Sequence, residues 1–395
     1  MHSVKPIFKY PIGLLFICLL NLGCKKTIPT PVRNGAFQVI SNNYGVALRD
    51  IEPTADGGYY ILAETLIHGN KDGWLIKMDA NNQQVWQKVF GSKYDETFVQ
   101  IVIDSAENVI AAGNTVGYGR IYDSLSNGTL SSDAYIYCCN KNGTTLWEKN
   151  HYCLGNNLGI GYDLLKNIIV LPNRKYAFCG TTRNVIKSGI YSQTGWVVIL
   201  DEMGMKTNEY LVDTVNIINT LTENPNHNLT FEGYQFLKTP KISSFFQINP
   251  TQISGNNIQF GVCTWPFISS NAAIVYEEMI RIGPSLVNHY QGYFGYNYLV
   301  SYEYNSDNYS YYIKNIDLPV TYNAIKVNAD LSITCANENG TVKSILDGQI
   351  EFSINYGIKA NRILKLKKNR MLISIENTNK IELYITDYTG KPWGN

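Results

Sequence analysis

The chain has 395 residues, of which 45% are hydrophobic, 12% aromatic and only 16% charged. This composition excludes intrinsic disorder, which needs few apolar residues and a high net charge. With 33 basic and 32 acidic side chains the net charge is +1, so the basic excess typical of nucleic-acid-binding proteins is missing and no nucleic-acid partner is expected. The length exceeds the roughly 250–300 residues at which single cores give way to several domains or to repeats.

The N-terminal segment has the pattern of a secretion signal. The apolar run Ile12–Leu22 is shorter than the about 20 residues of a membrane-spanning helix, but it suits a signal-peptide core. Gly23 directly before Cys24 resembles the lipobox of bacterial lipoproteins, in which the cysteine is lipidated and becomes the mature N-terminus. That family prefers leucine three residues before the cysteine, whereas here Leu20 stands four residues before it and Asn21 takes the preferred place. The alternative is an ordinary signal peptide cleaved nearby.

The resemblance implies a lipid anchor at Cys24 and an outer-membrane location, because Lys25 is not the aspartate that retains enterobacterial lipoproteins in the inner membrane. We therefore expect a lipoprotein signal peptide at 1–23, a proline-containing tether at 24–35 and a folded body at 36–395. No later stretch reaches about 18 apolar residues, so the lipid is the only membrane contact that we expect.

The body contains a repeat with a period of 61 residues. The recurring residues are an aromatic residue (Trp74, Tyr135, Trp196), an Asp or Asn five positions later (Asp79, Asn140, Asp201), and a further position seven residues on (Trp86, Trp147, Asn208). A second matching element precedes each copy and ends in Thr65, Thr115 or Thr182. The repeat is therefore best defined over residues 46–212.

Each repeat is predicted to form four short strands, which in the first copy are Val46–Glu52, Gly58–Thr65, Gly73–Asp79 and Gln84–Phe90. The segments are rich in β-branched and aromatic residues, and Asp-Gly and Asn-Asn sequences between them suit tight turns. Four-stranded units of 50 to 60 residues are typical of β-propeller blades. We therefore predict an all-β propeller in which the recurrent tryptophans fill the space between blades.

The segments Asp79–Trp86 and Asn140–Trp147 resemble the repeats of quinoprotein-like propellers. They are closer still to repeats of surface and secreted proteins of Bacteroidota, which share an Asp-Gly-Gly-Tyr element and a following Asp-x-Trp-Leu-x-Lys-x-Asp element. This resemblance implies a fold and a lineage but no reaction.

The repeat pattern weakens after residue 212. Asn226–Gly233 resembles a second strand, and Arg370–Ile375 with Leu383–Trp393 forms a clearer copy. A blade-like unit at each end of the body suits a closed ring, in which Phe37–Ser41 completes the last sheet. The length predicts seven blades, with six as the alternative. A propeller to about residue 220 followed by a β-sandwich is the main competing interpretation.

The sequence contains no recognisable catalytic or metal-binding motif. No Cys-x-x-Cys pair occurs, and Cys138-Cys139 lies inside a predicted strand, so we expect one buried and one outward-facing thiol. The four histidines after the signal lie far apart and are expected in solvated loops. Neither a serine-hydrolase elbow nor a phosphate-binding loop is present. We predict no cofactor, no metal and no catalytic residue, and we keep a carbohydrate-active or quinoprotein-like enzyme as the alternative.

Tyrosine is the one unusual feature that suggests a ligand. Ten tyrosines fall between Tyr290 and Tyr322, and tyrosine rings suit sugar stacking and protein interfaces. The candidate ligand-binding residues are Tyr293, Tyr296, Tyr298, Tyr302 and Tyr304. The alternative is that they cover a blade face as ordinary strand residues. Long inserts at Val116–Ser132 and Arg183–Gln193 are further candidates. The predicted function is a lipid-anchored binding or scaffolding module for a glycan or an envelope protein.

Overall fold

The structure is a computed structural model that describes residues 38–41, 43–67, 69–116, 132–153, 161–186, 190–212 and 216–223. Beyond residue 223 it describes the strands up to residue 387 and a few residues beside them. The signal peptide, Cys24 and the tether lie outside these residues. The described part is almost entirely β-structure, and its helical element is the three-residue turn η1 (Pro172–Arg174). No helix within it is long and apolar enough to cross a bilayer.

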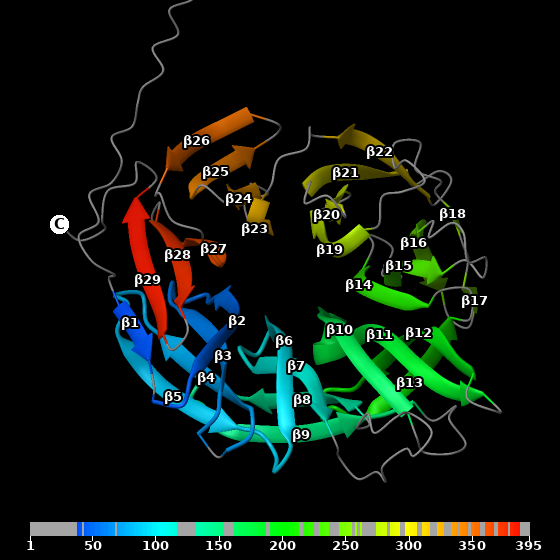
Figure 1. The fold of residues 1–395 in the computed structure, drawn as a ribbon, viewed down its shortest axis with the longest axis horizontal. Helices are drawn as coiled ribbons and strands as arrows, with labels where there is room; N and C mark the ends of the chain where they lie inside the picture. Colours follow the sequence, from blue (N-terminus) through cyan, green and yellow to red (C-terminus); the bar gives the residue numbers. More distant parts are fainter. Residues whose placement is uncertain are drawn as a thin grey trace, which may run out of the picture.

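The strands form antiparallel sheets that follow one another around a central axis (Figure 1). The first blade contains β2 (Val46–Pro53), β3 (Tyr59–Thr65), β4 (Asp72–Met78) and β5 (Gln84–Phe90). The second blade contains β6 (Asp95–Ile103), β7 (Val109–Val116), β8 (Ser132–Cys139) and β9 (Thr145–His151). The third blade contains β10 (Gly161–Leu171), β11 (Lys175–Ile186), β12 (Ile190–Leu200) and β13 (Lys206–Val212). The second and third blades are joined into one eight-stranded sheet by a single bridge, Tyr162 with Ser132.

The following sheets continue the same pattern around the axis. One contains β14 (Ile217–Glu223), β15 (Leu229–Phe236), β16 (Phe245–Ser254), β17 (Asn257–Ile258) and β18 (Gly261–Val262). The next contains β19 (Ile274–Ile282), β20 (Ser285–Gly292), β21 (Asn297–Asn305) and β22 (Ser310–Ile316). A further sheet contains β23 (Tyr322–Val327), β24 (Ile333–Asn337), β25 (Thr341–Leu346) and β26 (Gln349–Asn355).

The last blade combines both ends of the body. It contains β27 (Arg362–Leu366), β28 (Arg370–Asn377), β29 (Lys380–Asp387) and β1 (Gln38–Ser41). The N-terminal strand therefore completes the last sheet, as the sequence predicts, with Gln38 opposite Leu383 and Ser41 opposite Lys380. The fold is an all-β propeller with four-stranded antiparallel blades. The described strands group into seven units, six of four strands and one, β14–β18, of five, and a blade count for the complete chain stays a prediction.

The four strands predicted for the first blade agree with the structure to within one residue at each end. The agreement follows from the turns. In the turn that begins at Asp79, the fourth residue, Asn82, has a positive φ of 64°, a conformation that Asn and Gly tolerate. The matching turns of the next two blades place Gly143 (φ 79°) and Gly204 (φ 72°) at this position.

Every described blade has a turn end and a loop end. We define the turn end by the tight turns 54–58, 79–83, 104–108, 140–144 and 201–205, each closed by backbone hydrogen bonds between its ends. The loop end is the opposite end of the strands, with the connections 66–71 and 91–94 and the residues at 152–153 and the start of β10. The short turns and the longer connections therefore lie on different faces of the ring.

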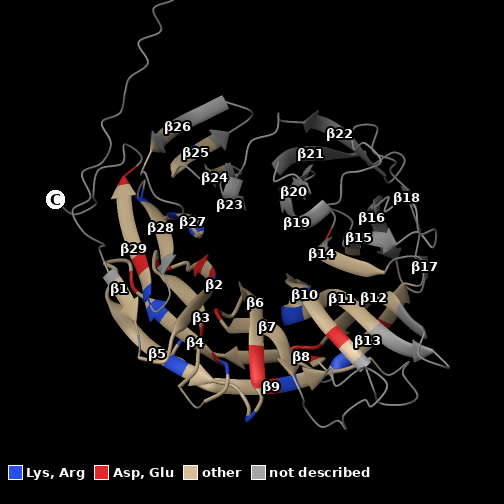
Figure 2. Cartoon of the chain, in the orientation of Figure 1, with Lys and Arg blue, Asp and Glu red and all other residues tan. Residues whose placement is uncertain are grey.

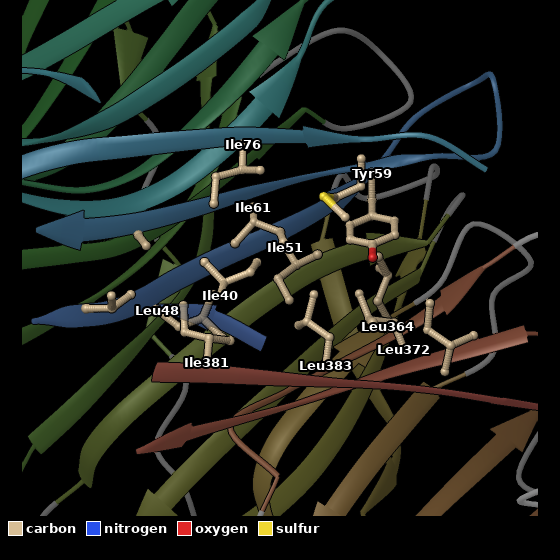
Figure 3. Close-up of a cluster of buried hydrophobic side chains, with 14 of the residues drawn as sticks. Ile40, Leu48, Ile51, Tyr59, Ile61, Ile76, Leu364, Leu372, Ile381 and Leu383 are labelled. Carbon is tan, nitrogen blue, oxygen red and sulfur yellow. The ribbon is translucent and has the colours of Figure 1, made fainter. Parts of the chain in front are cut away.

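Apolar side chains pack between consecutive blades, as a propeller requires. Figure 3 shows the cluster that joins the last blade to the first, in which Ile61 and Ile76 face Leu372 and Leu383. Trp147 and Trp196 belong to the cluster between the second and third blades, and Trp74 lies in the cluster of Figure 3. The prediction that the recurrent tryptophans fill the space between blades is confirmed for these three.

The adjacent cysteines correct one expectation. Cys138 packs in the cluster toward the third blade and Cys139 in the cluster toward the first, so the two side chains point to opposite faces as predicted. Both, however, are buried, and neither is outward-facing. The physical reason is that a propeller blade has a neighbour on each face, so a strand inside it has no solvent side.

Candidate functional site

Polar side chains on the innermost strands join each blade to the next. Asp50 on β2 accepts a hydrogen bond of 2.9 Å from the backbone N–H of Ile101 in the second blade. Gln100 on β6 accepts one from the N–H of Ile168 in the third blade at 3.3 Å. Asn167 on β10 continues the series and accepts the N–H of Leu221 at 2.9 Å. Each of these three acceptors directly follows a break in the register of its strand.

A second series of braces comes from the residue before the repeat threonine. Glu64 accepts the N–H of Phe98 in the next blade at 2.7 Å. Asn114 makes two hydrogen bonds to the Leu165 backbone. Its side-chain oxygen accepts from the Leu165 N–H at 2.7 Å, and its side-chain nitrogen donates to the Leu165 carbonyl oxygen at 3.2 Å. Thr181 donates to the carbonyl oxygen of Asn216 at 2.7 Å. These buried groups therefore have a structural task, because each satisfies a backbone group of its neighbour.

The loop end of the first two blades contains a buried carboxylate network. Glu96 is fully buried and accepts hydrogen bonds from the Ser92 N–H (3.0 Å), the Ser92 hydroxyl (2.6 Å) and the Thr115 hydroxyl (2.9 Å). Burial raises the pKa of Glu96, the hydrogen bonds oppose this rise, and the nearby Asp72 adds to it. Asn70 joins the two connections of this end by donating to the carbonyl oxygen of Tyr94 at 2.6 Å. The network holds the connections 66–71 and 91–94 against each other.

The corresponding position at the loop end of the second and third blades has different residues. Counted by the 61-residue period, His151 stands at the position of Phe90 and Cys153 at that of Ser92. The Cys153 N–H donates to Asp163 at 2.8 Å, as the Ser92 N–H does to Glu96. Asp163 is one methylene shorter than Glu96, and the Thr182 hydroxyl, which matches Thr115, makes no hydrogen bond. The hydrogen bond from the backbone N–H to the carboxylate is therefore kept, but the threonine hydroxyl no longer donates to it.

His151 contradicts the expectation that the histidines lie in solvated loops. It ends strand β9, is only 6% exposed and packs against the Phe178 ring at 5.8 Å between ring centres. Burial, with the charges of Lys206 and Lys149, lowers the pKa of His151 to about 4, so the ring is neutral at physiological pH. His289 lies in β20, and the other two histidines after the signal lie outside the described residues.

The buried carboxylates of the loop end have a structural role. Glu96 and Asp163 are buried and accept hydrogen bonds from backbone or hydroxyl donors, so they hold the connections between blades. Within the described residues no group of three His, Cys, Asp or Glu side chains is placed to hold a metal ion. Figure 2 shows Lys and Arg interspersed with Asp and Glu over the described blades.

Exposed tyrosines mark the loop end. Tyr44 precedes β2 and is 54% exposed, Tyr152 follows β9 and is 43% exposed, and Tyr162 near the start of β10 is 36% exposed. The Lys206 ammonium lies 5.9 Å from the centre of the Tyr152 ring and donates to the Tyr152 carbonyl oxygen at 2.8 Å, which fixes this residue. The large exposed apolar side chains near the turn end are aliphatic or methionine: Val85, Leu146, Met203 and Met205. Exposed aliphatic side chains occur at the loop end as well, where Leu66 in the connection 66–71 is 45% exposed.

The tyrosines predicted from the sequence are only partly placed. Tyr293, Tyr296 and Cys24 lie outside the described residues. Tyr298, Tyr302 and Tyr304 lie in β21, where Tyr298 pairs with Tyr290 and Tyr304 with Tyr311. Their role as ligand-binding residues stays a prediction.

The insert Arg183–Gln193 is different from the expected loop. β11 and β12 continue into it, with Arg183 opposite Gln193 and Ile186 opposite Ile190, so most of it is a strand extension. Val116 and Ser132 end the strands on either side of the other insert, and 117–131 lies outside the described residues.

Sequence reasoning missed the loop-end tyrosines Tyr44, Tyr152 and Tyr162, because they are scattered and do not form a run. A signal was nevertheless present. Tyr152 and Tyr162 fall in the segment between one repeat and the next, which connects the outer strand of one blade to the inner strand of its neighbour. In a propeller this connection lies at the same end as the join between the second and third strands.

Solved structures with similar folds agree with this architecture. The chain aligns with the Raptor protein of Chaetomium thermophilum at a TM-score of 0.55 and 9% identity, over 90% of this chain and 28% of that one. It aligns with an acylaminoacyl peptidase of Pyrococcus horikoshii at 0.52 and 11%, over 87% of this chain and 52% of that one. The WD40 β-propeller domain of Doa1 aligns at 0.45 and 11%, over 89% of this chain and 96% of that one.

These likenesses concern the fold alone, because the identities are low and the chain spans about a quarter to a half of the first two proteins. No protein-family model matches the sequence, and no curated protein matches it.

Proposed function

We propose that this propeller is a lipid-anchored cell-envelope module that binds a glycan through its loop end. The observation that supports binding is the set of exposed tyrosines at the loop end, Tyr44, Tyr152 and Tyr162. A partly exposed tyrosine ring offers a flat apolar surface together with a hydroxyl, and this combination suits a sugar ring. The lipid anchor is supported by the sequence before Cys24.

Binding is favoured over catalysis because two carboxylates of the loop end, Glu96 and Asp163, serve as buried acceptors. Glu96 and Asp163 are buried acceptors for Ser92 and Cys153, so neither is presented to a substrate. A hydrolase acting on glycans needs two carboxylates about 5–9 Å apart on either side of the bond that it cleaves. The burial of these carboxylates therefore favours a surface that binds a ligand over one that cleaves it.

A glycan array probed with two triple variants tests the proposal. The loop-end variant carries Tyr44→Ala, Tyr152→Ala and Tyr162→Ala, and the turn-end control carries Val85→Ala, Leu146→Ala and Met203→Ala. Stacking contributes about 1 kcal/mol a ring, so three rings together correspond to roughly a 100-fold loss of affinity in the loop-end variant. The control should bind as the native protein does.

Equal binding by both variants would contradict the role of the loop end. If the native protein instead captures an envelope protein and the loop-end variant does not, the ligand is a protein and the glycan assignment is wrong. Circular dichroism of both variants shows whether the fold is kept, which we expect because all six side chains are exposed. Cys24→Ala should release the protein from membranes into the soluble fraction.

A further inference from the structure

The direction of strand β1 shows which end of the ring lies nearer its first residue, Gln38. Arg370 begins β28 and donates to two carbonyl oxygens of the first blade, Ala80 at 2.6 Å and Gly57 at 3.1 Å. Both carbonyls belong to turns of the turn end, so the Arg370 end of the last blade lies at the turn end. Asp387 is the register partner of Arg370 and lies at the same end of β29.

Strand β1 runs antiparallel to β29, from Gln38 opposite Leu383 to Ser41 opposite Lys380. Lys380 is at the other end of β29 from Asp387, which is the loop end. The chain therefore runs along β1 from the turn end toward the loop end. Gln38 is therefore the end of β1 that lies nearer the turn end.

We propose that the turn end faces the membrane and that the loop end faces away from it. This inference rests on the lipid anchor at Cys24 proposed above. A flexible chain of about 14 residues, the number from Cys24 to Phe37, has a root-mean-square length of about 20 Å. A seven-residue strand is about 23 Å long, so the distance between the two ends of the ring is similar to the reach of such a chain.

The surface of the turn end suits this placement. Val85, Leu146, Met203 and Met205 are between 46% and 58% exposed there. The Trp147 indole donates to the Glu202 carbonyl oxygen at 3.1 Å, so the start of β9 and the turn 201–205 lie beside each other at this end. Contact with acyl chains removes aliphatic and methionine side chains from water. This transfer is favourable, so it favours this face at a bilayer.

Photo-crosslinking in membranes tests the orientation on the full chain. A benzophenone amino acid replaces Asn81 at the turn end, or Tyr44 or Leu66 at the loop end, all of them exposed residues of the first blade. The lipidated protein is inserted into vesicles that contain an alkyne-tagged phospholipid and is irradiated. We expect at least several-fold more lipid adduct from position 81 than from position 44 or 66.

Flotation of the vesicles separates this inference from the anchor on which it rests. If the native chain floats, Cys24→Ala does not, and adducts from positions 44 and 66 equal or exceed those from 81, the orientation is wrong and the anchor stands. If Cys24→Ala floats as well, or the native chain does not float, the anchor is wrong and the orientation falls with it. Strong adducts from position 81 alone support both.

Discussion

The indole of Trp147 donates a hydrogen bond to the Glu202 carbonyl oxygen at 3.1 Å, across the boundary between the second and third blades. The same relationship holds one blade earlier, where Trp86 donates to the Lys141 carbonyl oxygen at 2.9 Å. In both cases the ring lies over the glycine of the next turn, where a Cβ would come within 2.7 Å of it on Gly204 and within 3.2 Å on Gly143. The Asp-x-x-Gly turn and the tryptophan of the repeat are therefore two halves of one contact between neighbouring blades.

Gly204→Ala is predicted to destabilise the propeller more than Gly45→Ala. Both glycines have positive φ, 72° and 87°, and alanine there costs about 1 kcal/mol. A Cβ on Gly204 would also lie 2.7 Å from the Trp147 ring, whereas one on Gly45 meets nothing within 4 Å. The collision adds about 1–3 kcal/mol, so urea unfolding should show a clearly lower midpoint for Gly204→Ala. Equal midpoints would mean that the tryptophan is not held against the turn.

Arg370→Met should weaken closure of the ring. The guanidinium is buried and bonds to two carbonyl oxygens of the first blade, and burial lowers its pKa. Removing the donors leaves these acceptors without their partner, at a cost of about 2–4 kcal/mol in thermal or urea unfolding. Arg362→Met is the control, because Arg362 also bonds across this boundary, to the Arg49 carbonyl oxygen, but is exposed. A larger effect of Arg362→Met would contradict the assignment of Arg370 as the closing residue.

Thr115→Val and Thr182→Val should differ although the two residues occupy the same place in the repeat. Thr115 donates to the buried Glu96 carboxylate at 2.9 Å, so its loss costs about 1–3 kcal/mol. The Thr182 hydroxyl is buried without a hydrogen bond, so valine there should be neutral or stabilising. Differential scanning calorimetry of the two variants compares them directly. A fall in melting temperature for Thr182→Val would show that its hydroxyl has a partner in solution.

The stability of the propeller should depend on pH through His151. Its pKa is lowered from 6.5 to about 4 in the folded state, so between these pH values the unfolded chain binds more protons than the folded one. Stability is therefore lost as the pH falls through 6.5 toward 4, by on the order of 3 kcal/mol in total. His151→Phe, which introduces the residue of the first repeat, should remove this part of the pH dependence. Denaturant midpoints at pH 7.5, 6, 5 and 4.5 for both proteins measure it, and parallel curves would contradict it.

Much of the fold follows from the sequence because its turns and strands are local. Asp79 and Asn140 accept the N–H groups of their own turns, so spacing alone predicts where the hairpins lie. The burial of Cys139 and His151 could not be predicted in this way, because it depends on a neighbouring blade whose position no local pattern contains. The braces at Glu64 and Asn114 likewise become visible only once Phe98 and Leu165 are placed beside them.

The candidate site was less predictable than the fold. Tyr44, Tyr152 and Tyr162 come from separate segments and share one end of the ring only because the strands alternate in direction. The tyrosines between Tyr290 and Tyr322 stood out because they are close in sequence, which is a different property from sharing a surface.

The pairing of Gln38 with Leu383 joins the first strand of the body to its last-formed sheet. Until β28 and β29 have been synthesised, β1 has no partner, so the ring cannot close while the chain is still emerging. Closing so long a loop carries an entropy cost. This cost is incurred at the end of folding and makes the closing step slow relative to blade formation. An open ring leaves the apolar faces of Figure 3 uncovered, so the chain is most prone to aggregation during that interval.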